Sequence, residues 1–364
     1  MGLKVKLIAL FLLIGLVPAI VISLLAYNST EKQLKEDAFS KLDMYAALSK
    51  EQLGEFMDSK ESALNVLAVT RNVYQSLNVL KEAEWNIADP LWLERLRILE
   101  EIAPTIIEEF ECEFFFLTSP EGKVIFSTHK EMLGADLFDR DYTQGALAGQ
   151  TAWGDIIFSD IVHKNVLTVS APIRSGGSAG EIIGTVSLAM GQEYVAAAVH
   201  EGIGELGRTG DSYLIDAEGL LLTSTMSGEY TEEAVLKQRI DSPAVVMLSS
   251  PIKGGNFDYY HHEEYKNYLG KDVLGALSVA RTGNKPMGFV VEVESAEVLA
   301  GVARMRNLMV TIAVLCAAII AVAAYFVALT LVRPVEKVSG LTMKLAEGDF
   351  TVQADVRSRD EIGQ

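Results

Sequence analysis

The stretch Leu308-Met-Val-Thr-Ile-Ala-Val-Leu-Cys-Ala-Ala-Ile-Ile-Ala-Val-Ala-Ala-Tyr-Phe-Val-Ala-Leu-Thr-Leu-Val332 contains no charged residue. A helix needs about 20 apolar residues to cross the hydrocarbon core of a bilayer, so this stretch is long enough to span a membrane. Arg333-Pro334 follows it directly, and an amphipathic helix can be read after that pair. A membrane span that leads straight into an amphipathic helix is typical of a protein that carries a signal through a membrane.

A second apolar run lies near the start of the chain, from Leu7 to Tyr27, and it also lacks charge. It is longer than the roughly 7–15-residue apolar core of a signal peptide, and no clear small-residue cleavage site follows it. We therefore expect two transmembrane helices, at residues 7–27 and 308–332.

Charged residues beside the two runs predict the topology. Lys4 and Lys6 flank the first run, and Arg333 and Lys337 flank the second on the same side. Basic residues favour the cytoplasmic side of a membrane, and Arg304 with Arg306 on the outer flank opposes this only weakly. Residues 1–6 and 333–364 are then cytoplasmic, and residues 28–305 are extracytoplasmic.

The composition excludes several classes of function. The formal net charge is −18, and the charges from Arg306 onward balance, so the acidity lies between the two runs and argues against binding nucleic acid. Cys112 and Cys316 are the only cysteines, so neither a disulfide framework nor a cysteine zinc site is expected. The sequence contains no P-loop, G-x-S-x-G or H-E-x-x-H motif, so we expect no catalytic site, no cofactor and no metal. His261-His262-Glu263-Glu264 is expected to be a solvated polar loop.

The region after the first span has a helical pattern. From residue 29 to about residue 84, apolar side chains recur at three- and four-residue steps with charged residues between them. This spacing predicts one long helix that continues the first membrane span outward. Gly54 leaves open the alternative of two shorter helices broken near that residue. Helical spacing returns from Leu91 to Phe110.

At Cys112 the pattern changes to that of strands and turns. A unit at about 112–192 contains two hairpin strands, a helix-sized piece and two longer strands: 113–118, 123–128, 139–148, 165–172 and 180–190. The order recurs more weakly at about 205–295, with strands at 211–216, 220–224, 273–280 and 287–293. The predicted fold class is α+β: a long N-terminal helix and two tandem antiparallel-sheet domains between two transmembrane helices.

Several segments, taken in this order between two membrane spans, resemble bacterial methyl-accepting chemotaxis proteins with a double Cache ectodomain. They are Asp139-Arg-Asp-Tyr-Thr-Gln-Gly-Ala-Leu-Ala-Gly149, Val166-Leu-Thr-Val-Ser-Ala-Pro-Ile173, Gly207-Arg-Thr-Gly-Asp-Ser-Tyr-Leu-Ile-Asp216, Tyr265-Lys-Asn-Tyr-Leu-Gly270 and Val273-Leu-Gly275. The resemblance covers essentially the whole chain. It implies PAS-like Cache modules, one membrane-distal at about 112–192 and one membrane-proximal at about 205–295.

Residues 333–364 are similar to the start of a HAMP domain, a parallel four-helix bundle formed by two subunits. The residues that carry this similarity, and that we expect to transmit the signal, are Arg333, Pro334, Val335, Val338, Leu345, Asp360, Glu361 and Gly363. Leu331, Val335, Val338 and Leu345 follow a heptad seam, which predicts a homodimer. The chain reaches its last residue where the second HAMP helix is expected to begin, so the module is expected to be partial and the output domain missing.

The resemblance also places a ligand site in the membrane-distal module. Arg140 and Tyr142 stand where amino-acid-binding members have an arginine and an aromatic that grip the ligand, and Trp153, Phe158 and Asp160 lie on the loop expected to cover it. Thr143 and Ala189 stand where those members have a second aromatic and the aspartate that binds the ligand amine. A carboxylate or another small anion is therefore expected rather than an amino acid. Arg140 in a structural ion pair with Asp139, Asp141 or Asp155 is the open alternative.

These observations predict a receptor of the bacterial cytoplasmic membrane, and most directly a chemotaxis receptor. Its expected partners are a small-molecule ligand, membrane lipid, a second copy of the chain and, if an output domain exists, downstream cytoplasmic signalling proteins. The same input half is also found in sensor histidine kinases, diguanylate cyclases and phosphatases, and a surface-binding protein without output is a further alternative. The protein is not expected to be an enzyme within these 364 residues.

Overall fold

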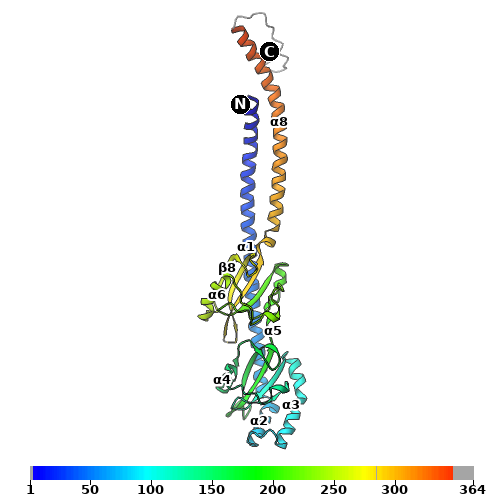
Figure 1. Cartoon of the computed structure of the whole chain (residues 1–364), viewed down its shortest axis with the longest axis vertical. Helices are drawn as coiled ribbons and strands as arrows, with labels where there is room; N and C mark the ends of the chain where they lie inside the picture. Colours follow the sequence, from blue (N-terminus) through cyan, green and yellow to red (C-terminus); the bar gives the residue numbers. More distant parts are fainter. Residues whose placement is uncertain (1–2, 284, 347–364) are drawn as a thin grey trace. The chain divides into compact units, whose positions relative to one another are not determined.

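The computed structural model describes residues 3–283 and 285–346, without the side chains of residues 3–5, 7, 8, 328–338, 341, 344 and 345. The chain divides into two compact units, one made of residues 1–36 and 299–364 and the other of residues 37–298 (Figure 1). Each unit is described by itself.

The first unit contains the start of α1 (Leu3–Val69) and the whole of α8 (Ala300–Ala346). Both helices contain a stretch long and apolar enough to cross a membrane, and the apolar side chains along these stretches are largely exposed. Gly15 of α1 lies against Ile320 of α8, where an added Cβ would come within 2.7 Å of the Ile320 Cδ1 atom. The glycine therefore allows the two apolar helices to approach closely, as small residues do between membrane helices.

The residues expected to transmit the signal lie outside the described side chains. Arg333, Pro334, Val335, Val338 and Leu345 belong to α8, but only their backbone is described. Asp360, Glu361 and Gly363 fall in residues 347–364, outside the described residues. The heptad seam and the dimer that it implies stay predictions.

The long helix predicted for residues 29–84 is interrupted once, and not near Gly54. α1 runs through Gly54 to Val69, and α2 (Arg71–Glu82) begins after Thr70. Thr70 has extended backbone angles, φ −66° and ψ 130°, and its Oγ1 donates a hydrogen bond to the Val66 carbonyl at 2.9 Å. This bond pairs a carbonyl that the end of α1 would otherwise leave free.

The first sheet, in residues 37–298, is antiparallel in the order β2-β1-β6-β5-β3, with β4 also paired to β5. Its strands are β1 (Phe114–Thr118), β2 (Val124–Ser127), β3 (Ala152–Trp153), β4 (Ile157–Ser159), β5 (Lys164–Arg174) and β6 (Ile182–Gly191). The helices of this part are α3 (Pro90–Glu109), η1 (Lys130–Met132) and α4 (Asp141–Leu147). The hairpin, short helix and two long strands predicted here are confirmed.

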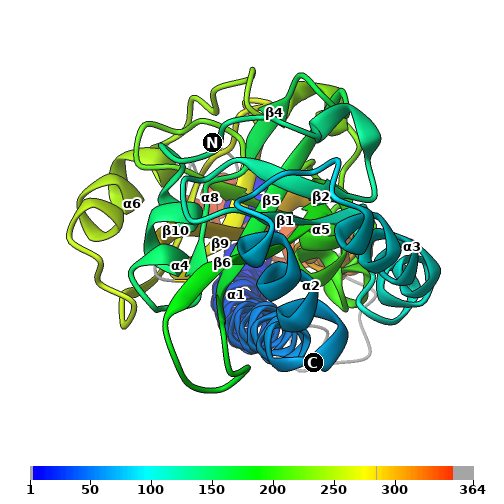
Figure 2. The same cartoon turned by 90° about the horizontal axis from the view of Figure 1, so that it is seen from below.

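Opposite faces of the first sheet have different neighbours, because side chains alternate along a strand. α2 contacts β5 and β6, and α3 contacts β1, whereas α4 contacts β3, β5 and β6. Figure 2 shows α2 and α3 grouped on one side of these strands and α4 on the other. Phe115, Leu167 and Leu188 join the core on the α2–α3 side, and Phe114, Tyr142 and Ala189 form a separate cluster on the α4 side.

The second sheet is antiparallel in the order β7-β10-β9-β8. Its strands are β7 (Asp211–Ile215), β8 (Tyr260–Lys266), β9 (Asp272–Thr282) and β10 (Lys285–Glu294). The helices around it are α5 (Gln192–His200), η2 (Ile203–Leu206), η3 (Glu232–Ala234), α6 (Pro243–Lys253) and α7 (Ser295–Val298). α6 contacts β8, β9 and β10 on one face.

Two predictions for the second sheet are wrong. Residues 220–224 form no strand: Leu220 and Leu221 make isolated bridges to Arg239 and Ile215, because the hydrogen bonds of this segment are divided between residues 238–239 and β7. His261 and His262 belong to strand β8 instead of a loop. β8 is an edge strand whose side chains are all exposed except that of Tyr265, so it lacks the apolar alternation that reveals a half-buried strand.

A single hydrophobic core joins the two sheets. It includes Leu42 and Leu64 of α1, Leu188 of the first sheet, and Phe289 and Val291 of the second. Each sheet keeps a smaller cluster on its other face, under α4 in the first and against α6 in the second. The two faces that carry these smaller clusters are the candidate binding faces of the two modules.

Candidate functional site

The face of the first sheet that α4 covers carries a row of buried hydroxyl groups, which we call the hydroxyl face. Its members come from β1, β5 and β6, and each is at most 4% exposed: Thr118, Thr168, Ser170, Thr185 and Ser187. The Oγ1 atoms of Thr118 and Thr185 are 2.7 Å apart, and the Oγ atoms of Ser170 and Ser187 are 2.5 Å apart. Directly opposed residues on antiparallel strands point to the same face, so these hydroxyls lie together.

Thr143 of α4 adds an unpaired hydroxyl to this part of the molecule. Its side chain is fully buried, and its Oγ1 finds no hydrogen-bond partner among the residues that the structure describes. A buried hydroxyl without a partner costs free energy relative to one in water. An oxygen or nitrogen atom of a ligand between α4 and the sheet would provide the missing partner.

The surroundings of the hydroxyl face are apolar and uncharged. The buried cluster on the α4 side consists of Phe114, Phe116, Val124, Met132, Leu137, Tyr142, Val166 and Ala189. Among the described residues the buried carboxylates are Asp211 and Glu292, and both belong to the second sheet. The hydroxyl face can therefore form hydrogen bonds to a ligand, but it offers no buried acid to a ligand amine.

Arg140 and Tyr142 lie at the start of α4, at the edge of this site. Tyr142 is buried, and its ring lies over Gly154, where an added Cβ would come within 2.6 Å of its Cδ1. Burial raises the pKa of Tyr142 to about 12, although the positive charge of Arg140 opposes that shift. Arg140 is exposed and forms no ion pair with the residues described; Asp141 and Asp155 instead bind Lys285.

The other three predicted site residues do not converge with Arg140 and Tyr142. Trp153 stands opposite Val169 on the core side of the sheet, and its Nε1 donates a hydrogen bond to Glu61 Oε1 of α1 at 2.5 Å. Phe158 is 48% exposed and lines a cavity of about 280 Å³ between the β4–β5 turn, the start of α5 and η3. Asp160 is exposed in the same turn.

The residue-by-residue prediction missed the hydroxyl face, although the sequence holds a signal for it. Thr168-Val-Ser170 and Thr185-Val-Ser187 have the same spacing, which places two hydroxyls on one face of each strand. Only the pairing of β5 with β6 shows that the two faces coincide and are covered by α4.

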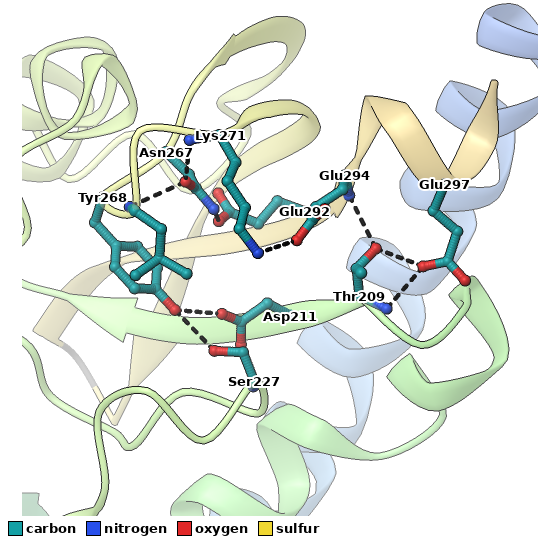
Figure 3. Close-up of polar contacts among 10 residues, drawn as sticks. Thr209, Asp211, Ser227, Asn267, Tyr268, Lys271, Glu292, Glu294 and Glu297 are labelled. Carbon is teal, nitrogen blue, oxygen red and sulfur yellow. Dashed lines mark hydrogen bonds and ion pairs between the residues drawn. The ribbon is translucent and has the colours of Figure 1, made fainter. Parts of the chain in front are cut away.

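The second sheet holds a buried polar network on the corresponding face, and Figure 3 shows its contacts between Asn267 and Glu292 and between Tyr268 and Asp211. Glu292 of β10 and Asp211 of β7 stand opposite each other and are 1% and 3% exposed. Glu292 accepts hydrogen bonds from the Tyr265 hydroxyl and the Asn267 amide, both at 2.8 Å. Asp211 accepts one from the Tyr268 hydroxyl at 2.6 Å. The chain's own side chains therefore satisfy the two acids.

Burial controls the protonation of this network. It raises the pKa of Glu292 to about 7, although hydrogen bonds from Asn267 and Tyr265 oppose the shift. Burial also raises the pKa of Tyr265 well above its usual value, so its hydroxyl stays a donor. Tyr265 reaches Glu292 across Gly275 of β9, where an added Cβ would come within 2.4 Å of the tyrosine ring. The glycine is what makes room for this bond.

A second carboxylate contact lies where β10 leads into α7. Glu297 accepts hydrogen bonds from the backbone N–H groups of Arg208 and Thr209, at 3.0 and 2.8 Å, and from the Thr209 hydroxyl at 2.5 Å (Figure 3). The Thr209 hydroxyl also accepts the Glu294 N–H at 3.2 Å. The loop before β7 is thereby fastened to the residues that precede α8 in the chain.

Two PAS-like sheet modules behind a long helix, together with two apolar helices able to cross a membrane, define the class of two-pass membrane proteins with an extracellular sensor domain. The chain belongs to the Cache domain family: the model for the Cache domain matches residues 26–302, and that for the HAMP domain matches residues 326–364. The protein is thus a transmembrane receptor of the Cache type, with two Cache modules and a HAMP region.

Solved structures with the same fold include sensor domains from two kinds of receptor. The sensor domain of the histidine kinase DctB of V. cholerae is 12% identical, with a TM-score of 0.50 over 73% of this chain and 98% of that chain. The ligand-binding domain of the Campylobacter jejuni chemoreceptor Tlp3, in complex with 4-methylisoleucine, is 15% identical, with a TM-score of 0.51 over 73% and 94%. The same domain with L-norvaline has a TM-score of 0.50 at 15% identity, again over 73% and 94%. The search of curated proteins found no match.

Proposed function

We propose that this protein is the input half of a chemotaxis receptor that binds a small extracellular ligand between α4 and the hydroxyl face. The observation that carries the proposal is the set of buried hydroxyls under α4, with Thr143 left unpaired, in a Cache module that follows one membrane helix and precedes another. A ligand that binds one arrangement of α4 more tightly than another shifts the balance between them, and this is sufficient to start a signal. α8 and the HAMP region carry that signal to the cytoplasm.

A small carboxylate or another small anion is the ligand class that this site favours. The Tlp3 domain was solved with 4-methylisoleucine and with L-norvaline, which both carry an amino group. Here Ala189 faces the site, and none of the described residues on this face supplies a buried acid for such a group. Hydroxyl groups and the guanidinium of Arg140 at the edge are suited to a carboxylate, which accepts hydrogen bonds and attracts positive charge.

The remaining parts of the proposal concern the membrane and the assembly. We place the protein in the bacterial cytoplasmic membrane as a homodimer, with residues 28–305 outside and both ends of the chain inside. Lys4, Lys6, Arg333 and Lys337 support this orientation, and the heptad seam supports the dimer. The signalling role requires no catalytic site within these 364 residues.

A sensor histidine kinase is the second candidate, and the likeness in fold to the DctB sensor domain favours it. The coding sequence after codon 364 discriminates between the two. Long uninterrupted heptads with Glu and Gln pairs on one face would support a chemotaxis receptor. A histidine-bearing dimerisation helix followed by Asn- and Gly-rich ATP-binding segments would support a kinase and contradict the first proposal.

The ligand site is tested with the full chain in lipid nanodiscs. Pentanoate and L-norvaline differ only by the α-amino group, so thermal shift with this pair, and with acetate, pyruvate and succinate, reports the ligand class directly. We expect a carboxylate to stabilise the protein and Arg140→Ala to weaken its binding by about tenfold or more, the size of a hydrogen bond to a charged group. Arg97→Ala, at an exposed position of α3, is the control and should bind as the wild type does. Stabilisation by L-norvaline but not by pentanoate would contradict the ligand class.

A further inference from the structure

One lysine of the second sheet forms ion pairs with the segments that cover the hydroxyl face. Lys285 is the first residue of β10, and its Nζ lies 3.0 Å from Asp141 Oδ2 and 2.7 Å from Asp155 Oδ1. Its side chain is 29% exposed, whereas those of the two aspartates are 70% and 61% exposed. The lysine therefore reaches out of the second sheet and forms ion pairs with two carboxylates of the first module at once.

Both aspartates belong to what we call the lid, which is α4 together with residues 152–155. Asp141 is the first residue of α4 and stands between Arg140 and Tyr142. Asp155 follows Gly154, the residue against which the Tyr142 ring lies. A change in the position of Lys285 would therefore act on both segments next to the proposed ligand.

The turn between β9 and β10 supports this contact from the core side. Gly283 lies against Trp153, and an added Cβ at Gly283 would come within 2.2 Å of the indole Cδ1. Trp153 is also fixed to α1 by its hydrogen bond to Glu61. Gly283, next to the start of β10, thus packs on a buried side chain that a hydrogen bond also holds, which gives Lys285 a defined position.

β10 is suited to carry a displacement from the lid to the other end of the sheet. It is an inner strand, paired with β7 on one side and β9 on the other. At its far end the Glu294 N–H donates to Thr209, and Glu297 holds the loop at Arg208 and Thr209. A strand paired on both edges moves as a stiff element, so its two ends are mechanically connected.

We propose that Lys285 is a positioning residue that couples closure of the lid to the position of β10, and through it to the residues that lead into α8. The inference rests on the proposed function, in which the ligand binds between α4 and the hydroxyl face. Ligand-induced movement of the lid then pulls or releases β10 through the two ion pairs. Coupling of this kind is reciprocal: if ligand binding shifts β10 through Lys285, a shift of β10 alters ligand affinity by the same factor.

Amide hydrogen exchange of the full chain in nanodiscs, without any ligand, tests the first half of the inference. Lys285→Met keeps the length of the side chain and removes its charge, and we expect exchange in residues 141–155 to become about fivefold faster, the size of a moderately exposed ion-pair network. Lys285→Arg should behave as the wild type, and Lys285→Asp combined with Asp155→Lys should restore much of the protection. Lys266→Met, which removes an exposed ion pair with Asp272 on the edge of the same sheet, is the matched control and should leave the lid unchanged.

Three results would overturn the inference. The first is amide exchange in residues 141–155 of Lys285→Met that equals that of the wild type. The second is exchange in these residues of Lys285→Arg that is as fast as in Lys285→Met. The third is exchange in residues 243–253 of α6 that becomes as much faster in Lys285→Met as exchange in the lid does. Such a result would indicate that the substitution destabilises the whole second module, whereas loss of a positioning contact should affect the lid alone.

The second half is tested with pentanoate and the other compounds of the thermal-shift series. In the wild type, the compound that binds should change exchange in residues 294–298. In Lys285→Met that change should vanish, because the two ion pairs that connect the lid to β10 are gone. An unchanged response at residues 294–298 would contradict the coupling. If no compound binds the wild type, the proposed ligand site fails, and lid exchange in the ligand-free protein still decides the role of Lys285.

Discussion

Individual polar atoms distinguish the two modules of this receptor. Among the described residues of the first module no Asp or Glu is buried, and the polar groups under α4 are the hydroxyls of Ser and Thr. In the second module Glu292 and Asp211 are buried, and tyrosines and Asn267 satisfy them. The first face is left with an unpaired Thr143, whereas the two buried acids of the second face are paired by the chain's own side chains. This difference is why we place the ligand in the first module.

Replacing Thr143 by Val is expected to move stability and binding in opposite directions. The substitution keeps the shape of the side chain and removes a buried hydroxyl without a partner, so the ligand-free protein should gain about 1 kcal/mol. If the hydroxyl bonds the ligand, affinity should fall by about tenfold. Chemical denaturation and calorimetry measure the two effects.

Thr118→Val is the contrasting variant for this experiment. It removes a hydroxyl that is paired with Thr185, so it should destabilise the protein. A Thr143→Val protein that is destabilised as much as Thr118→Val would show that Thr143 already has a partner in the folded chain.

Glu292 makes a testable contribution to the pH dependence of stability. Its pKa is raised to about 7 in the folded protein, so between pH 4.5 and about 7 the folded state holds a proton that the unfolded state has released. The stabilising contribution is therefore complete below about pH 4.5 and is lost as the pH rises to about 7, and it amounts to roughly 3 kcal/mol at about 1.4 kcal/mol per pKa unit. The unfolding free energy of Glu292→Gln should therefore lack the fall between pH 4.5 and about 7 that Glu292 causes in the wild type. Glu233→Gln, at an exposed position, should keep that fall. Parallel pH profiles of wild type and Glu292→Gln would refute the assignment.

At the scale of elements, the short helix α7 is held to the second module by the Glu297 carboxylate, by a hydrogen bond from the Ser295 hydroxyl to Glu264 at 3.0 Å, and by Val298 packed against the core. Glu297 pairs two consecutive N–H groups that follow Gly207, whose φ of 134° lies in the region that glycine adopts without strain. α7 has only the residues Ser295–Val298, so its own hydrogen bonds cannot fix its position. The Glu297 contact therefore helps to fix α7 on the second module.

Glu297→Gln is expected to release the backbone of Arg208 and Thr209. The hydrogen bond from Thr209, with help from the Arg208 N–H, lowers the pKa of Glu297, so this contact is present above the ordinary pKa of glutamate and is lost as the pH falls through the lowered value. Exchange of the Arg208 and Thr209 amide protons should become several-fold faster in the variant, because a neutral amide is a weaker acceptor than a carboxylate. Glu205→Gln, an exposed residue of η2, serves as the control. Equal protection in Glu297→Gln and the wild type would show that the loop is held by other contacts.

At the scale of the whole molecule, thiol labelling tests the proposed orientation. Burial raises the pKa of Cys112 to about 11, so this native thiol should react slowly with a maleimide, and Cys316 lies in the apolar run of α8. A cysteine at an exposed position of the ectodomain, Ser178→Cys, should be labelled in intact cells by a membrane-impermeant maleimide. Ser339→Cys should be labelled only after the cells are permeabilised. The reverse pattern would contradict an extracytoplasmic ectodomain.

The sequence by itself determined the membrane helices, the α+β class and the two tandem modules. The apolar runs, the three- and four-residue spacing and the strand–turn–strand units are local patterns, and local backbone preference with burial is enough to read them. The sequence did not predict edge strand β8, because a solvated strand has no alternation of apolar and polar residues. It also did not predict the helix break at Thr70, because no glycine or proline marks a boundary there.

Only the tertiary structure decided the composition of the sites. Trp153 and Tyr142 are close in sequence, yet the pairing of β3 with β5 puts Trp153 on the core side of the sheet, while Tyr142 joins the cluster on the α4 side. Lys285 lies far along the chain from Asp141 and Asp155, and its ion pairs with them arise from the meeting of two modules. Contacts between residues distant in sequence depend on strand register and on how elements pack, and no local pattern encodes either.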